Sequence, residues 1–161
     1  MLKSLSAFDA YKHALNVIEG RWPEAEPIIL QDSMWAVDYA KNIIKDRWPE
    51  AEPKILRSAS ASFHYAKYVL LRRWYEAEPI ILTDPKWTYF YAKFLIKERW
   101  HQGEQTILTS VQWTASYAMD VLKERWPEAE SKFSLSDDVF WRVYRQKFLA
   151  PKNLFWFKDG F

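Results

Sequence analysis

The chain has 161 residues, of which 49% are hydrophobic and 18% aromatic, and this composition excludes a disordered chain. Its net charge of +2 gives no global attraction to nucleic acid or to an anionic membrane, and the absence of cysteine excludes disulfides, thiolate nucleophiles and cysteine-ligated zinc. The start "MLKSLSAFDAYKHALN" has no signal-peptide core, and no later run reaches the roughly 20 apolar residues of a membrane span, so we expect a cytoplasmic protein.

The chain begins with one helix near residues 6–20 and then repeats itself. The stretch "RWPEAEP" begins at Arg21, recurs unchanged at Arg47, and recurs with substitutions at Arg73, Arg99 and Arg125, which is a period of 26 residues without insertions. We call these five segments the first to fifth corners, and a set of equivalent positions in successive repeats a column. A fixed period of this length is typical of solenoids, in which each unit buries its apolar face against its neighbours.

Between corners the sequence predicts a long amphipathic helix, as in "DSMWAVDYAKNIIKDRW". Ser6, Asp32, Ser58, Asp84, Ser110 and Ser136 share one column, and each is expected to cap a helix start. Trp48 precedes Pro49 and should leave the helix, because proline disfavours helical geometry in the residue before it. A short second helix then runs through about "PEAEPIIL". The fourth corner, "RWHQGEQ", lacks both prolines, so its helix boundaries are the least defined.

The fold class is therefore all-α, an α-solenoid of tandem 26-residue helix–corner–short-helix repeats forming one domain over residues 1–161. Residues 1–20 are expected to form an N-terminal cap helix, 21–124 four complete repeats, and 125–161 the last corner and an aromatic C-terminal cap. The tail residues Phe155, Trp156, Phe157 and Phe161 are expected to cover the open end, with a docking segment as the alternative.

The most constant columns hold Arg, Trp and Glu. In the three central corners these are Arg47, Trp48, Glu52, Arg73, Trp74, Glu78, Arg99, Trp100 and Glu104. They could grip phosphates or bases, one per repeat, or they could be structural, with Trp filling the corner and Arg bridging Glu. The Arg and Trp are identical in every repeat, which favours the structural interpretation, since a protein that binds one ligand of limited size rarely needs five identical binding sites.

The sequence offers little chemistry for an enzyme. The three glycines are too scattered for a phosphate-binding loop, and the three histidines lie in different columns, without the spacing of a helical zinc pair. We expect no catalytic residues, no metal and no cofactor, although a site assembled from distant residues stays open.

Each long helix has a polar face opposite its apolar arc. Summed over six helices, these faces carry ten basic residues and four acidic ones. Its centre is also aromatic, and the candidate binding residues, expected on adjacent exposed faces, are Lys67, Tyr68, Phe90, Lys93, Phe94 and Lys97. Aromatics interleaved with cations suit an acidic protein surface or a phosphate-bearing ligand. The alternative is that the lysines only complement helix ends and the rings pack on neighbours. Curvature with the long helices inside would favour the binding interpretation.

The combination of "YAK", "RWPEAEPIIL" and a "DP" or "DS" opening the next unit resembles the two-helix repeat arrays of hypothetical bacteriophage and bacterial or environmental proteins, over about residues 6–134. The resemblance implies no reaction and no ligand. For a chain of phage origin it implies a protein that acts in the host cytoplasm, where it binds a host factor or sequesters a host signalling molecule.

We therefore expect a non-enzymatic scaffold with a protein partner. The alternative is sequestration of a nucleotide-like anion on the basic, aromatic face. A membrane is excluded as partner, and nucleic acid is not favoured.

Overall fold

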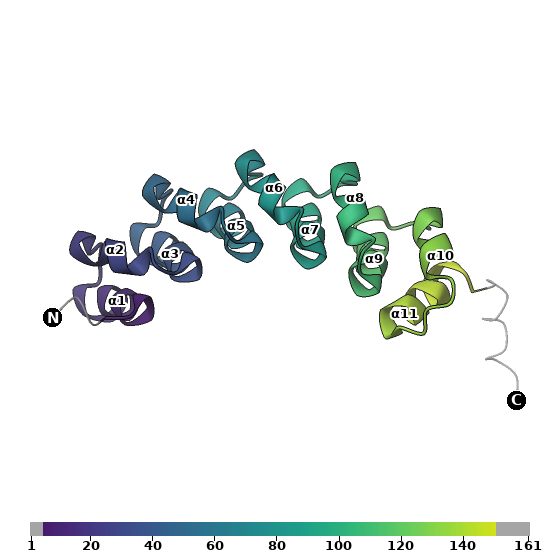
Figure 1. Ribbon diagram of the computed structural model, residues 1–161, viewed down its shortest axis with the longest axis horizontal. Helices are drawn as coiled ribbons and strands as arrows, with labels where there is room; N and C mark the ends of the chain where they lie inside the picture. Colours follow the sequence, from purple (N-terminus) through teal and green to yellow (C-terminus); the bar gives the residue numbers. More distant parts are fainter. Residues whose placement is uncertain (1–4, 151–161) are drawn as a thin grey trace, which may run out of the picture.

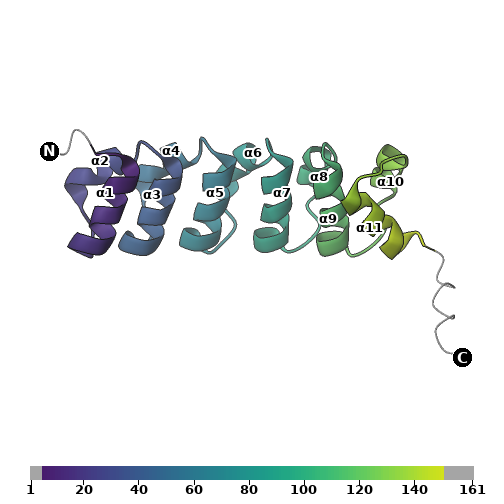
Figure 2. The ribbon, with the colours of Figure 1, turned by 90° about the horizontal axis from the view of Figure 1, so that it is seen from below.

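The computed structural model describes residues 5–150, and within this range every regular element is helical. Long and short helices alternate along an arc (Figure 1), and each long helix packs on the long helix of the next unit. The long helices line the inner, concave edge of the arc and the short helices its outer edge. Seen from below, the long helices lie side by side in one row (Figure 2). The predicted all-helical repeat fold is confirmed, and the curvature places the long helices inside.

Each long helix of the first five units is a seven-residue α-helix that continues into a five-residue π-helical turn. The α-helical parts are α1 (Ala7–His13), α3 (Ser33–Tyr39), α5 (Ala59–Tyr65), α7 (Pro85–Tyr91) and α9 (Val111–Tyr117), and the last long helix, α11 (Val139–Phe148), is α-helical throughout. The π turns are η2 (Ala14–Ile18), η4 (Ala40–Ile44), η6 (Ala66–Leu70), η8 (Ala92–Ile96) and η9 (Ala118–Leu122).

The long helices end earlier than the sequence predicted. Lys45, directly after η4, has φ 59° and ψ 27°, and its N–H bonds to the Ala40 carbonyl at 2.7 Å. A left-handed residue of this kind ends a helix. The same conformation recurs without glycine at Glu19, Leu71, Lys97 and Lys123. Trp48 is non-helical as predicted, yet the helix has already ended three residues before it.

The caps follow the predicted column in four units and fail in two. The side chains of Ser6, Asp32, Ser58 and Asp84 accept backbone N–H groups of the helices that follow them. Ser110 makes no such bond, and α11 is capped by Asp138 in place of Ser136. The last unit is one residue longer than the others. In it the corner Trp and the Tyr that bonds to it are 18 residues apart, whereas they are 17 residues apart in the other units.

Prolines decide how the short helices are built. Where Pro27, Pro53 or Pro79 is present, a 3₁₀ turn precedes a four-residue α-helix, since proline lacks the N–H that a continuous α-helix needs. These pairs are η3 (Pro23–Ala25) with α2 (Glu26–Ile29), η5 (Pro49–Ala51) with α4 (Glu52–Ile55), and η7 (Tyr75–Ala77) with α6 (Glu78–Ile81). Gln105 and Ser131 replace this proline in α8 (His101–Ile107) and α10 (Pro127–Phe133), which are therefore uninterrupted.

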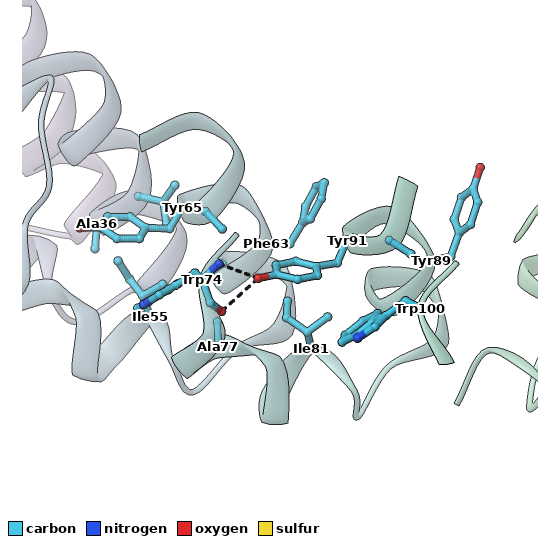
Figure 3. Packing of buried hydrophobic residues seen from close by; sticks show 14 of the residues in the cluster. Ala36, Ile55, Phe63, Tyr65, Trp74, Ala77, Ile81, Tyr89, Tyr91 and Trp100 are labelled. Carbon is cyan, nitrogen blue, oxygen red and sulfur yellow. Dashed lines mark hydrogen bonds between the residues drawn. The ribbon is translucent and has the colours of Figure 1, made fainter. Parts of the chain in front are cut away.

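The core lies between the two helical layers and repeats with the sequence. Figure 3 shows its centre, where the Trp74 ring packs on Tyr65 and Ile55 of the preceding unit, and Trp100 packs in the same way on Tyr91 and Ile81. The largest fully buried side chains are mostly members of the Trp, Tyr and Ile columns: Trp48, Trp126, Trp141, Tyr39, Tyr65, Tyr91, Tyr117, Tyr144, Ile29, Ile55, Ile81 and Ile107. The small Ala column at the ends of the α-helices lets the layers approach closely.

Candidate functional site

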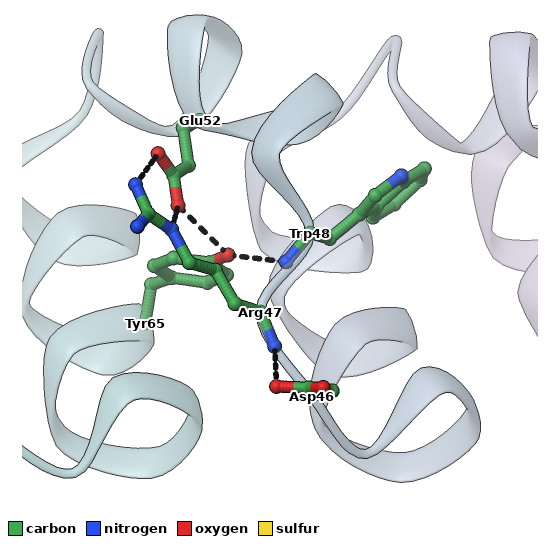
Figure 4. A network of polar contacts seen from close by, with 5 residues as sticks. All are labelled: Asp46, Arg47, Trp48, Glu52 and Tyr65. Atoms are coloured by element: carbon green, nitrogen blue, oxygen red, sulfur yellow. Dashed lines mark hydrogen bonds and ion pairs between the residues drawn. The ribbon is translucent and has the colours of Figure 1, made fainter.

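The corner residues form a polar network whose Arg–Glu pair and Trp–Tyr hydrogen bond recur in each corner. In the second corner (Figure 4), Arg47 donates from Nε and Nη2 to the two oxygens of Glu52, at 2.6 and 2.8 Å. Tyr65 accepts the backbone N–H of Trp48 at 2.6 Å and donates to Glu52 at 3.2 Å. Equivalent Arg–Glu pairs occur at Arg21–Glu26, Arg73–Glu78, Arg99–Glu104 and Arg125–Glu130.

Burial and pairing shift the pKa values of this network. Burial raises the pKa of the Tyr65 phenol to about 12, while the bond from the Trp48 amide opposes this shift. The hydrogen bond to Glu52 raises the pKa of Arg47. Each Arg thus bridges to a Glu of its own corner.

The corner tryptophans are buried, as the sequence predicted. Trp48 is 1% exposed, and Trp74 and Trp100 are each 4% exposed. The indole N–H of Trp100 donates to Gln102, whereas that of Trp48 is buried without a partner. A buried indole cannot stack on a ligand, so these columns hold the layers together.

The candidate binding face lies on the concave row of long helices. Counting about 100° per residue, Phe90 points away from the buried Thr88, Tyr91 and Ala92, which face the short helices. Figure 3 accordingly shows Phe63 and Tyr89 on the side of the long helices away from Ile81. Partly or fully exposed rings meet across α5–η6, α7–η8 and α9. We call them the concave aromatic surface: His64, Tyr68, Trp87, Phe90, Phe94 and Trp113.

These rings touch one another across three units. The His64 ring lies 5.2 Å from Trp87, Trp87 lies 5.8 Å from Phe90, and Phe90 lies 5.5 Å from Trp113, measured between ring centroids. Phe94 stacks on Phe90 at 6.0 Å. The surface is therefore continuous, and no single helix carries it.

The six predicted binding residues do not all occupy the surface in the expected way. Tyr68 is 41% and Phe94 38% exposed, and Lys97 is exposed, as expected. Phe90 is only half-buried rather than freely exposed, because Trp87 and Trp113 pack on its two sides. Lys67 and Lys93, expected on exposed faces, are half-buried as well.

The lysines lie over the rings. The Lys67 ammonium lies 3.6 Å from the Phe94 ring centroid and 5.0 Å from that of Tyr68, and Lys41 lies 4.8 Å from Tyr68. Lys86 lies 4.6 Å from Trp87. Such positions allow cation–π attraction, and they keep positive charge at the edge of the apolar surface.

Lys93 belongs to an inter-unit network that the sequence analysis missed. Its ammonium lies 2.8 Å from Asp120 and donates to the Tyr89 hydroxyl at 3.0 Å, while that hydroxyl donates to Asp120. Hydrogen bonds to Asp120 and Tyr89 raise the pKa of Lys93. Burial acts to raise the pKa of Asp120, but the bonds from Lys93 and Tyr89 outweigh it and lower this pKa.

The same pairing recurs elsewhere, between residues 31 apart. Asn42 donates to Tyr11, and Phe94 packs near Phe63 at 6.4 Å. The repeat alignment shows that all these pairs join the same two columns. It does not show that the two columns face each other across neighbouring units. For the same reason the sequence alone does not reveal that Trp87 and Trp113 belong to this surface.

One acid lies beside the aromatic surface. Asp38 on α3 is half-buried, and burial raises the pKa of its carboxyl group, opposed by the charges of Lys41 and His64. Within residues 5–150, no group of three or more His, Asp or Glu side chains is placed to hold a metal ion. No helix in that range is long and apolar enough to cross a membrane.

The tail residues Phe155, Trp156, Phe157 and Phe161, expected to form a cap, lie outside the described residues. Comparison of the chain with models of known protein families, with curated proteins and with solved structures gives no significant match.

Proposed function

We propose that this protein is a non-enzymatic helical-repeat scaffold whose concave aromatic surface binds a protein partner through an acidic segment with apolar anchors. The observation that carries the proposal is the position of this surface. The rings are gathered on the long helices of three central units, which line the inner side of the arc, while the Arg–Glu pairs recur in all five corners. In solenoids the binding residues usually occupy variable columns on a fixed scaffold.

Charge supports an acidic partner. Lys41, Lys67 and Lys86 surround the rings, and none of them forms an ion pair within residues 5–150. Carboxylates of a partner would complement these ammonium groups and speed association. Aromatic residues supply much of the binding energy at protein interfaces, where apolar side chains of the partner would cover Tyr68 and Phe94.

The geometry favours a protein over a nucleotide-like anion. A base stacking on Phe94 would have to displace the Lys67 ammonium, which already lies 3.6 Å from the ring centroid. Neighbouring rings are mostly tilted, between 31° and 65°, and do not form a parallel slot for a base. Sequestration of an anion therefore stands as the second candidate.

Selection of peptides from a random display library tests the proposal. We expect the selected peptides to be rich in Asp and Glu around aromatic or aliphatic residues, and to lose binding to Lys67→Glu and Phe94→Ala variants. Arg57→Glu, an equal charge change after α4, is the matched control and should bind normally. Peptides that bind both surface variants undiminished would contradict the proposal. Native mass spectrometry of the purified protein distinguishes this proposal from sequestration of an anion, because sequestration requires a small anion bound to the protein.

A further inference from the structure

The third corner departs from the others at exposed positions that its backbone does not require. The second, fourth and fifth corners are preceded by a lysine and an acid, and the third by Leu71 and Arg72. Tyr75 occupies a position that is Pro23, Pro49, His101 or Pro127 elsewhere. The backbone is nevertheless the same, because Leu71 has φ 55° and its equivalents lie between 55° and 64°.

The three residues that differ here, Leu71, Arg72 and Tyr75, are all exposed. Leu71 is 77% exposed and Tyr75 66% exposed, although the ring of Tyr75 lies under the Arg73 guanidinium at 4.5 Å. Arg72 is exposed and forms no ion pair with any residue of the range 5–150. Exposed apolar and aromatic residues next to an unpaired cation are typical of binding sites.

Two of the departing residues, Arg72 and Tyr75, line one cavity of about 120 Å³ between the second and third corners. We call it the third-corner pocket, and it is lined by Arg47, Leu70, Arg72, Arg73, Trp74, Tyr75 and Glu76. One water needs only about 10–15 Å³ of such space, so the pocket admits a group of several heavy atoms.

Two of the three arginines are held in place and keep free donors. Arg47 and Arg73 each use Nε and Nη2 to bind Glu52 and Glu78. A guanidinium has five N–H donors, so Nη1 of each is left for a second anion. The Glu partners fix the side chains, which lowers the entropy lost on binding.

Charge distinguishes this pocket from its equivalents. Three arginines and Glu76 give its lining a formal charge of +2. The equivalent residues at the second corner, Arg21, Asp46, Arg47 and Glu50, sum to zero, as do those at the fifth. At the fourth corner Arg73, Glu98 and Arg99 sum to +1. Replacement of the acid by Arg72 therefore produces the most positive corner.

We propose that the third-corner pocket binds a phosphate group, with Arg47, Arg72 and Arg73 as its ligands. A carboxylate is satisfied by a single guanidinium fork, whereas a phosphate offers oxygens to three guanidinium groups at once. Tyr75 lines the pocket and supplies an apolar surface for the organic part of a phosphate ester. The site is separate from the concave aromatic surface and does not depend on the proposed function.

Titration with inorganic phosphate at constant ionic strength, followed by NMR of the arginine side chains and by calorimetry, tests this site. We expect saturable binding, weakened about tenfold or more by Arg72→Glu and unchanged by Lys132→Glu on α10. Phenyl phosphate binding more tightly than inorganic phosphate would assign the group to an organic ester, and equal affinity would assign it to the free ion.

A variant that gives the third corner the residues of the other corners distinguishes loss of phosphate binding from loss of folding. Leu71→Lys, Arg72→Glu and Tyr75→Pro together give the third corner residues that the other corners carry on the same backbone. This variant should keep its helical circular dichroism and melting midpoint while losing phosphate binding. Absence of saturable binding to the unmodified protein, or equal binding by the restored variant, would overturn the proposal.

Discussion

The Tyr65 phenol oxygen lies 2.6 Å from the backbone nitrogen of Trp48 and accepts a hydrogen bond from it, although Tyr65 follows Trp48 by 17 residues. The backbone of a corner is thus fixed by the next long helix. Equivalent bonds join Trp22 to Tyr39, Trp74 to Tyr91, Trp100 to Tyr117 and Trp126 to Tyr144.

Tyr65→Phe should therefore destabilise the protein by about 1–3 kcal/mol, because the buried Trp48 N–H would lose its only acceptor. Urea unfolding monitored by circular dichroism measures the change. Tyr68→Phe, which removes an exposed hydroxyl, is the control and should stay within about 0.5 kcal/mol of the unmodified protein. An equal effect of the two substitutions would show that the bond contributes nothing.

Trp74→Ala should lower the free energy of unfolding by about 3–5 kcal/mol, since it opens a cavity between two packed units. Trp22, in the first corner, is only partly buried, so Trp22→Ala should cost less. Thermal melting of both variants makes the comparison. An unchanged midpoint for Trp74→Ala would contradict the buried, structural role of this column.

Lys93→Glu and Lys97→Glu should differ, although the two residues are close in sequence and carry the same charge. Lys93→Glu would set a carboxylate against Asp120 and remove the bond to Tyr89, which we expect to cost about 1–2 kcal/mol. Lys97 is exposed in a left-handed conformation that Glu19 also adopts, so its replacement should be nearly neutral. Unfolding in urea at low salt distinguishes the two, and equal effects would refute the network.

The corner tyrosines should make the protein sensitive to alkali. Burial raises the pKa of Tyr65, Tyr91, Tyr117 and Tyr144 to about 12, above the ordinary tyrosine value of 10.0. Because the folded pKa is the higher one, the stabilisation is complete below about pH 10 and is lost as the pH rises toward about 12. Unfolding free energies measured across this window should fall steadily. A constant value would contradict the raised pKa values.

The sequence by itself determined the repeat and its layers. The 26-residue period, the column of buried tryptophans and the non-helical residue before the corner proline all follow from local preferences that act within one unit. Trp74 keeps the same conformation although Tyr75 replaces the proline, so the tyrosine of the next helix and the packing support what the proline favours elsewhere.

Local preferences did not determine the helix ends. Lys45 adopts a left-handed conformation that its residue type does not favour, because the chain must turn there for Trp48 to reach its place between the layers. In the last unit the cap lies two residues after Ser136, at Asp138, and Tyr144 still meets Trp126 although it follows one residue later than its equivalents do. Packing outweighed the sequence signal in both places.

The candidate sites could be predicted only partly from the sequence, because they too depend on packing between units. The sequence placed Tyr68, Phe94 and the lysines on one side of the long helices, but exposure depends on the neighbouring unit. Phe90 is covered by Trp87 of its own helix and by Trp113 of the adjacent helix α9. The third-corner pocket joins residues 26 apart, Arg47 and Arg73. Only the tertiary structure decided the curvature and these contacts, because both arise from how one unit is rotated against the next.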